Sequence, residues 1–219
     1  MADSKIIIGD WSIKGRSEIL RQLCEFLCLP YQNKIYTDPN EWFLIDKPFL
    51  KSDFPNVPYI LDGDKVITET EACALYIISK SNKLELGGSD LDEVIYIAQV
   101  IGVIADLTNN FTKVAFNKEA DLEKGIEEAC IPKLMMLSKH LGDREWLIGK
   151  ISIADFFFVR ILGLISMNVE WLDEKFPNLA TYLQRFRDLH AIKEYLHSDR
   201  NLKAPSMLPN MVNPKFKLF

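Results

Sequence analysis

The chain begins with short apolar runs and with one helical pattern whose apolar residues lie on a single face. Residues 5–11 form an apolar run and residues 31–36 alternate between apolar and polar positions, as strands do. Between them, residues 17–29 carry apolar side chains three and four positions apart, which predicts a helix with one buried face that Pro30 ends. The chain therefore begins with a β-α-β order.

A hairpin and a second helix follow. An Asp-Gly pair at 62–63 separates the apolar runs 57–61 and 65–68, which predicts a tight turn between two strands. Residues 69–79 then show a helical pattern. Pro58 opens the third strand, and because proline cannot donate to a sheet ladder we expect an edge position or a cis turn there.

No strand pattern follows the polar, glycine-bearing linker at 81–89. Helical patterns cover residues 90–116, 120–141, 152–165, 178–187 and 191–196. We expect Pro132 to kink the second of these helices or to mark a boundary in it. The tail at 199–219 is irregular, rich in proline and apolar, so we expect it to pack on another surface. An α/β half thus precedes an all-helical half.

Composition narrows the classes of function. The chain has 219 residues, of which 48% are hydrophobic and 26% charged, as in an ordinary globular protein of one or two domains. Its apolar runs fall far short of the roughly 20 residues of a membrane span. A net charge of −5 disfavours nucleic-acid binding. The N-terminal residues show no signal-peptide pattern, so we expect a cytoplasmic location.

Cysteine and histidine offer no metal site in this sequence. Cys24 and Cys28 lie four residues apart in the first helical pattern, and Cys73 and Cys130 lie in other apolar segments. We interpret all four as buried thiols in a reducing compartment rather than as disulfides or metal ligands. The three histidines form no metal or triad signature.

Two motifs have both a structural and a functional interpretation. Ser152 and Asp155 have the spacing of a capping box, which favours a helix start over a catalytic serine. Glu69 and Thr70 precede a helix, where the side chain of Thr70 or of Glu69 would accept an N–H and cap it. The same helix end also suits a ligand carboxylate.

Several motifs in order resemble the soluble glutathione transferases, most closely the mu class. They span nearly the whole chain, at residues 7–15, 53–63, 67–70, 151–156 and 176–179. The first reads I-I-G-D-W-S-I-K-G against the family's I-L-G-Y-W-D-I-R-G, and the second reads D-F-P-N-V-P-Y-I-L-D-G against D-F-P-N-L-P-Y-L-I-D-G.

The resemblance implies a thioredoxin-like, glutathione-binding domain over 1–82 and an all-helical domain over 89–219 that ends in the irregular tail. It also implies a homodimer, with glutathione as co-substrate and no further cofactor.

The resemblance also assigns the glutathione site. The backbone of Val57, which precedes the family's cis-proline at Pro58, would pair with the cysteinyl part of glutathione like an added strand. Glu69 would take the γ-glutamyl ammonium, and Thr70 its carboxylate. Asn56 would lie beside the peptide.

The glycyl carboxylate would meet Trp11, Lys47 and Trp42. The spacing from Trp42 to Lys47 is one residue longer than in the family, so Phe43 is the alternative to Trp42. Asp106 matches an aspartate that reaches the glutathione of the other subunit.

The catalytic position departs from the family. The mu-class tyrosine that donates a hydrogen bond to the sulfur is replaced by Asp10. An ionised carboxylate has no proton to donate, and at about 4 Å it would raise the thiol pKa by roughly 3 units. A protonated Asp10 could donate, but that needs a strongly raised pKa of its carboxyl. Ser17, four residues before Arg21 as in serine-type transferases, is an alternative donor or simply the helix start, and Ser12 is a weaker one.

Two functions follow from this resemblance. The first is a glutathione transferase of reduced activity that conjugates an apolar electrophile. Its substrate pocket would be lined by Arg16, by Phe116 in place of an assisting tyrosine, and by the tail at 207–211. The second is a structural or binding subunit of a larger assembly that keeps the fold without the chemistry. Thiol-disulfide exchange lacks a cysteine near Asp10 or Ser17.

Overall fold

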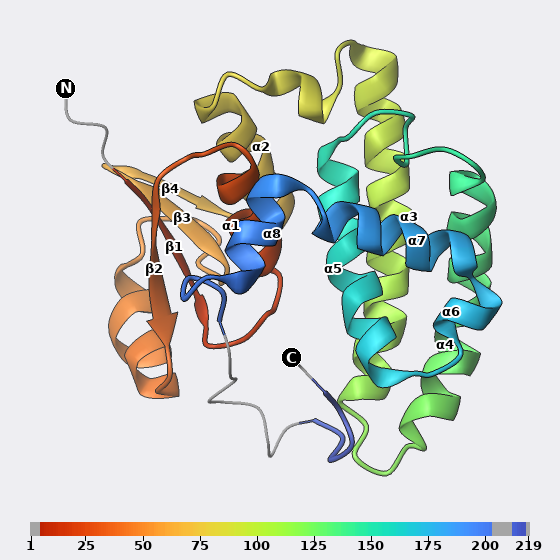
Figure 1. Cartoon of the computed structure of the whole chain (residues 1–219). Helices are drawn as coiled ribbons and strands as arrows, with labels where there is room; N and C mark the ends of the chain where they lie inside the picture. The colour runs from red at the N-terminus through yellow and green to blue at the C-terminus, as the bar shows by residue number, and fades with distance from the viewer. Residues whose placement is uncertain (1–4, 203–211, 218–219) are drawn as a thin grey trace. The chain divides into compact units, whose positions relative to one another are not determined.

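The computed structural model describes residues 5–202 and 212–217, which form two units (Figure 1). The first unit contains residues 5–84 together with 194–202, and the second contains 85–193 together with 212–217. The C-terminal return segment, residues 194–202, thus belongs to the first unit, whereas the sequence assigned it to the second domain.

A four-stranded sheet organises the first unit, in the order β2-β1-β3-β4. The strands are β1 (Ile6–Trp11), β2 (Tyr31–Tyr36), β3 (Tyr59–Asp62) and β4 (Lys65–Thr68). β1 runs parallel to β2 and antiparallel to β3, and β3 pairs with β4 as the predicted hairpin. The thioredoxin-like arrangement is confirmed. Pro58 precedes an inner strand, and its bond to Val57 is cis, so the expected cis turn is correct and the edge position is wrong.

Two helices, α1 (Ser17–Phe26) and α2 (Thr70–Lys80), cover one face of this sheet (Figure 1). Ile6 and Ile8 of β1 are fully buried beneath them, as strand alternation requires. On the opposite face the ring of Tyr59 lies over Gly9. A Cβ on Gly9 would come within 2.1 Å of that ring, so only glycine lets the aromatic side chain cover β1.

One cysteine does not lie where the sequence placed it. α1 ends at Phe26, and Cys28 has a φ of 52° and is exposed. The N–H of Leu29 donates to the carbonyl of Cys24 at 2.8 Å, a bond that closes the helix with a left-handed residue. Cys24 remains in the core, and the predicted burial of Cys28 is wrong.

The second unit is entirely helical within its described residues, which confirms the expected fold class. It contains η3 (Leu84–Gly87), α3 (Leu91–Ala115), α4 (Leu122–Leu141), α5 (Ile153–Asn168), α6 (Leu172–Lys175) and α7 (Pro177–Arg187), and α8 (His190–His197) leads back to the first unit. α4 continues through Pro132, so no boundary occurs there. Because Pro132 has no N–H, the carbonyl of Glu128 has no helical hydrogen bond. Both residues are exposed, so water can bind that carbonyl.

Asp155 lies in the first turn of α5, as predicted, and bonds to groups on either side of it. Its Oδ2 accepts the N–H and the hydroxyl of Ser152, at 2.8 and 3.0 Å. Its Oδ1 accepts the N–H of Leu147 and the hydroxyl of Tyr182, at 3.0 and 2.8 Å. The capping box is confirmed, and this carboxylate is structural.

The described part of the tail packs, as expected. Val212 and Asn213 are buried, and the N–H of Asn213 donates to the carbonyl of Ala115 at 2.7 Å. The rings of Phe216 and Phe111 lie 5.7 Å apart. The predicted pocket segment 207–211 falls outside the described residues.

Candidate functional site

A π-helical turn, η1 (Glu41–Asp46), followed by η2 (Lys47–Phe49), covers the face of the sheet opposite α1. The N–H of Lys47 bonds to the carbonyl of Trp42, five residues back, which is the spacing of a π turn. The turn accommodates the extra residue that the sequence shows between Trp42 and Lys47. Trp42 points inward, is 1% exposed, and packs with Tyr36 and Tyr59.

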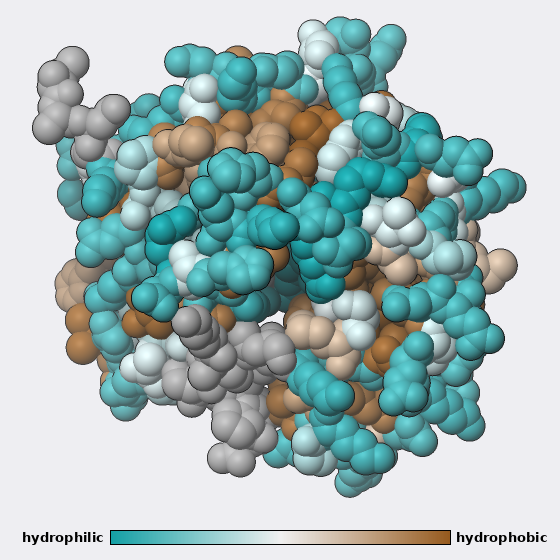
Figure 2. All heavy atoms as spheres, in the orientation of Figure 1, coloured by the Kyte–Doolittle hydropathy of each residue, from teal (hydrophilic) through white to brown (hydrophobic). Residues whose placement is uncertain are grey.

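Phe43 lies at the position that the sequence analysis first gave to Trp42. It is 53% exposed, its ring centroid lies 5.8 Å from that of Trp11, and the Nζ of Lys47 lies 5.7 Å from it. The structure therefore groups Trp11, Phe43 and Lys47 on the surface, which favours the alternative Phe43 over the buried Trp42. Figure 2 shows apolar side chains at the surface on the flank where Figure 1 draws this segment in orange.

The β3–β4 pairing brings two predicted elements of the site together. Tyr59 lies opposite Thr68, so Val57–Pro58 and Glu69–Thr70 emerge at the same end of the hairpin. Glu69 has a φ of 66° and, among the described residues, its side chain makes no capping bond to α2. Of the two predicted caps, the one by Glu69 is therefore wrong. The N-terminal end of α2 instead faces the cis turn without that cap, where an anion is favoured.

Asp10 is buried at the end of β1 and turned toward α1. It is 3% exposed, its Oδ1 accepts the N–H of Trp11 at 2.8 Å, and its Oδ2 accepts the N–H of Ser17 at 3.4 Å. Burial raises the pKa of the carboxyl, while the hydrogen bonds from Ser17 and Trp11 and the charge of Arg21 act in the opposite direction. Gly15 lies beside it, since a Cβ there would be in van der Waals contact with Oδ2, at 3.6 Å.

Ser17 acts as the first residue of α1. It is fully buried, and its N–H is bound by Asp10. A fully buried hydroxyl is closed to an incoming thiol, so the geometry favours the helix-start interpretation over the thiol donor.

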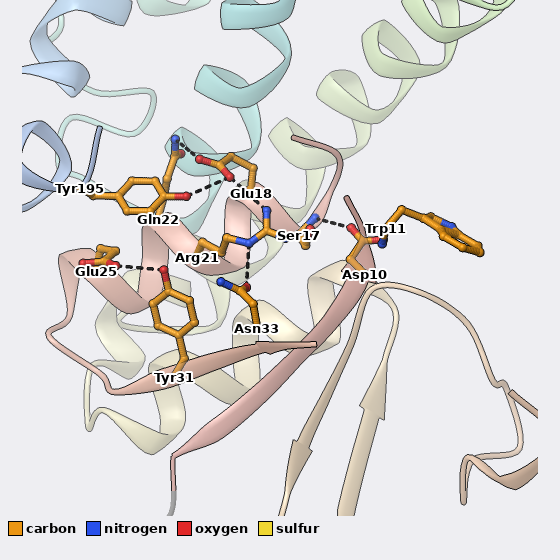
Figure 3. A network of polar contacts seen from close by, with 10 residues as sticks. All are labelled: Asp10, Trp11, Ser17, Glu18, Arg21, Gln22, Glu25, Tyr31, Asn33 and Tyr195. Carbon is orange, nitrogen blue, oxygen red and sulfur yellow. Dashed lines mark hydrogen bonds and ion pairs between the residues drawn. The ribbon is translucent and has the colours of Figure 1, made fainter. Parts of the chain in front are cut away.

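A buried polar network surrounds the first turn of α1 and was missed by the sequence analysis (Figure 3). Arg21 is fully buried and contacts Glu18 and Asn33, and Tyr195 joins Glu18 from the return segment. Glu18 and Arg21 had the pattern of an exposed helix face, and nothing in the sequence linked them to Tyr195.

The remaining predicted residues lie apart from this cluster. Asn56 is exposed next to Val57, and Arg16 is exposed just before α1. Phe116 lies at the end of α3 in the second unit, half exposed. Asp106, on α3, forms an ion pair of 2.7 Å with Lys133 of α4.

Residues 5–202 and 212–217 contain neither a candidate metal site nor a candidate membrane span. No group of three or more histidine, cysteine or acidic side chains there could hold a metal ion. None of the helices in those residues is both long and apolar enough to cross a membrane.

Comparison with known proteins identifies the family. The model of the glutathione S-transferase C-terminal domain matches residues 105–199. Glutathione S-transferase 2 of Gallus gallus is 32% identical over 209 residues, which cover 91% of this chain and 93% of that protein. The chain belongs to the glutathione transferase family. Its mu-class homologues include Glutathione S-transferase Mu 4 of Homo sapiens, 32% identical over 90% of this chain and 93% of that protein.

Solved glutathione transferases share the fold. The pi-class glutathione S-transferase of Onchocerca volvulus superposes with a TM-score of 0.79 at 24% identity, covering 93% of this chain and 97% of that one. A rat hPGDS chain complexed with a quinoline gives a TM-score of 0.75 at 21% identity, covering 88% and 96%. These likenesses establish the thioredoxin-like sheet followed by a helical domain.

Proposed function

We propose that this transferase-family chain binds glutathione on its first unit and conjugates the thiol to an apolar electrophile at a reduced rate. The observation that carries the proposal is the meeting of the cis turn at Val57–Pro58 with the N-terminal end of α2 at Glu69–Thr70. The curated relatives, at 32% identity, are named glutathione S-transferases.

The two ends of a γ-glutamyl peptide suit this geometry. The backbone of Val57 offers an N–H and a C=O to the cysteinyl residue, as an added strand would use them. The dipole of α2 and the Thr70 hydroxyl favour the γ-glutamyl carboxylate, and the exposed Glu69 favours its ammonium.

The glycyl end would lie at the surface group of Trp11, Phe43 and Lys47. The Lys47 ammonium neutralises a carboxylate there, and the two rings cover the backbone of the bound peptide. Asn56, exposed beside Val57, would contact the same peptide.

Asp10 is the reason for the reduced rate. The resemblance assigns this position to the tyrosine that donates to the sulfur, and a carboxylate that already accepts two N–H groups does not supply that proton. The loss of one such donor costs about 10²–10³-fold in rate, which leaves measurable activity. The electrophile would contact Arg16, which is exposed just before α1.

A homodimer fits the surface of the helical unit. Exposed apolar side chains gather on two adjacent helices, at Leu91, Val94 and Ile95 of α3 and at Met135 and Met136 of α4. We propose that a second copy of the chain covers these side chains. Asp106 would then leave its ion pair with Lys133 and contact the glutathione bound to that copy. Ile95→Glu should shift the sedimentation coefficient from dimer to monomer, and Lys113→Glu, on the same helix, should not.

The test of the function is the thiol pKa of bound glutathione, taken from thiolate absorbance against pH, with calorimetric binding alongside. We expect binding, with a thiol pKa no lower than that of free glutathione. A much lower pKa would show that another group activates the thiol, which contradicts the role given to Asp10. Absence of binding would overturn the proposed function.

A further inference from the structure

The first turn of α1 carries an ion pair that is closed off from water. Arg21 is 0% exposed and Glu18 is 4% exposed, and the Nη1 of Arg21 lies 3.1 Å from the Oε2 of Glu18. The Nε of Arg21 donates to Asn33 of β2 at 2.9 Å (Figure 3). Further hydrogen bonds to such a buried pair offset part of the cost of removing its charges from water. Among the described residues the Nη2 of Arg21 has no hydrogen-bond partner, so the support comes from the groups around Glu18 and from Asn33.

Tyr195 supplies such a partner from the other end of the chain. Its hydroxyl donates to the Oε2 of Glu18 at 3.1 Å, and its side chain is 0% exposed. Burial and the charge of Glu18 raise the pKa of Tyr195, so its hydroxyl stays protonated and remains a donor. The Glu18 carboxylate is thus fixed by its own helix and by the return segment.

A second contact binds the return segment to the last turn of the same helix. Arg200 donates two hydrogen bonds to Glu25, from Nε to Oε1 at 2.8 Å and from Nη2 to Oε2 at 3.1 Å. The hydroxyl of Tyr31 also donates to Glu25 Oε1, at 2.9 Å. Glu18 and Glu25 lie seven residues apart on one face of the helix, so the return segment spans α1 from its first turn to its last.

We propose that Tyr195 is a positioning residue for the glutathione site, holding the first turn of α1 in place through Glu18 and Arg21. That turn begins with Ser17, whose N–H is bound by Asp10, and it follows the loop of residues 12–16 next to Trp11. If Glu18 loses this donor, the first turn and the loop before it gain freedom that bound glutathione must then remove. This inference rests on the proposed function for its link to glutathione.

The test compares two substitutions, each of which removes a tyrosine hydroxyl that donates to a glutamate of α1. Tyr195→Phe breaks the bond to Glu18 at the first turn, and Tyr31→Phe breaks a bond to Glu25 at the last turn. Glutathione affinity is measured by calorimetry. Backbone hydrogen exchange is measured at Ser17 and Glu18, and at Leu27 and Cys28.

We expect Tyr195→Phe to weaken glutathione binding by about three- to tenfold, since a hydrogen bond to a charged group is lost from the support of the site. Exchange should accelerate at Ser17 and Glu18 and stay unchanged at Leu27 and Cys28. Tyr31→Phe should leave the affinity within about twofold and accelerate exchange only at the last turn.

Equal effects of the two variants on affinity would overturn the proposal, because they would reflect general destabilisation. Unchanged exchange at Ser17 and Glu18 in Tyr195→Phe would also overturn it. A wild-type chain that binds no glutathione would overturn the proposed function and, with it, the link to this site. The exchange pattern would still show whether Tyr195 orders the first turn.

Discussion

The carboxylate of Asp10 reaches across the loop between β1 and α1 and accepts the backbone N–H of Ser17 at 3.4 Å. Its other oxygen holds the N–H of Trp11 at 2.8 Å. A single side chain thus joins the end of a strand to the start of a helix, and it does so as an acceptor. A tyrosine at this position would present a hydroxyl that can donate a hydrogen bond. Asp10 instead accepts two backbone N–H groups and connects the strand to the helix.

Asp10→Asn tests how much the buried charge costs. Because the pKa of Asp10 is raised above its ordinary value of 3.8, the folded chain holds a proton that the unfolded chain releases as the pH rises past that value. The contribution of Asp10 to stability is therefore largest at low pH and is lost as the pH rises through the folded-state pKa.

Asn has no such loss, so we expect Asp10→Asn to gain stability relative to the wild type as the pH rises from about 4 to 7. Urea unfolding at several pH values measures the difference in free energy of unfolding. Burial also raises the pKa of Asp155, but this residue is present in both proteins, so its effect cancels in the difference between them. A difference that is constant with pH would contradict the raised pKa of Asp10.

Asp10→Tyr tests the proposed cause of the low rate. We expect the rate of glutathione conjugation to a standard electrophile to rise by up to about 10²–10³-fold, because a hydroxyl donor to the sulfur is introduced. Asp10→Phe is the matched control, since it adds the ring without the hydroxyl. A folded Asp10→Tyr protein with an unchanged rate would contradict our account of this position.

Lys47→Gln tests the glycyl end of the site. We expect glutathione affinity to fall by about three- to tenfold, since a partly exposed charge pair is removed. The glycyl ethyl ester of glutathione lacks that carboxylate, so it should bind the variant and the wild type equally well by calorimetry. An equal loss for both ligands would assign Lys47 a structural role instead.

The neighbours Trp42 and Phe43 should separate stability from binding. We expect Trp42→Phe to lower the free energy of unfolding by about 1–3 kcal/mol, because it leaves space in a packed aromatic cluster. Phe43→Ala should change stability by no more than about 0.5 kcal/mol and weaken glutathione binding. Chemical denaturation and calorimetry on both variants provide the measurement, and the reverse pattern would restore Trp42 to the surface.

Local rules sufficed for most of the fold. The Asp-Gly turn between two apolar runs fixed the β3–β4 hairpin, and Ser152 with Asp155 fixed the start of α5. The motif around Pro58 gave the cis turn. Each of these signals lies within a few residues of the structure that it determines.

The misses came from backbone conformations and from distant partners. The extra residue before Lys47 left Trp42 and Phe43 as alternatives. The π turn buries Trp42 and exposes Phe43, and a residue count alone could not decide between them. A left-handed residue carried Cys28 out of the helix that holds Cys24. Tyr195 and Glu18 are separated by 177 positions, so no pattern in either segment predicts their contact.

The return segment also sets the order of events during synthesis. Residues 5–84 leave the ribosome more than a hundred residues before Tyr195 and Arg200 are made, although those two side chains complete the support of α1. Until then the Glu18 carboxylate lacks its last donor. The thioredoxin-like unit is therefore the first part of this chain to be translated, and it reaches its final form only after residues 85–193 of the helical unit have emerged.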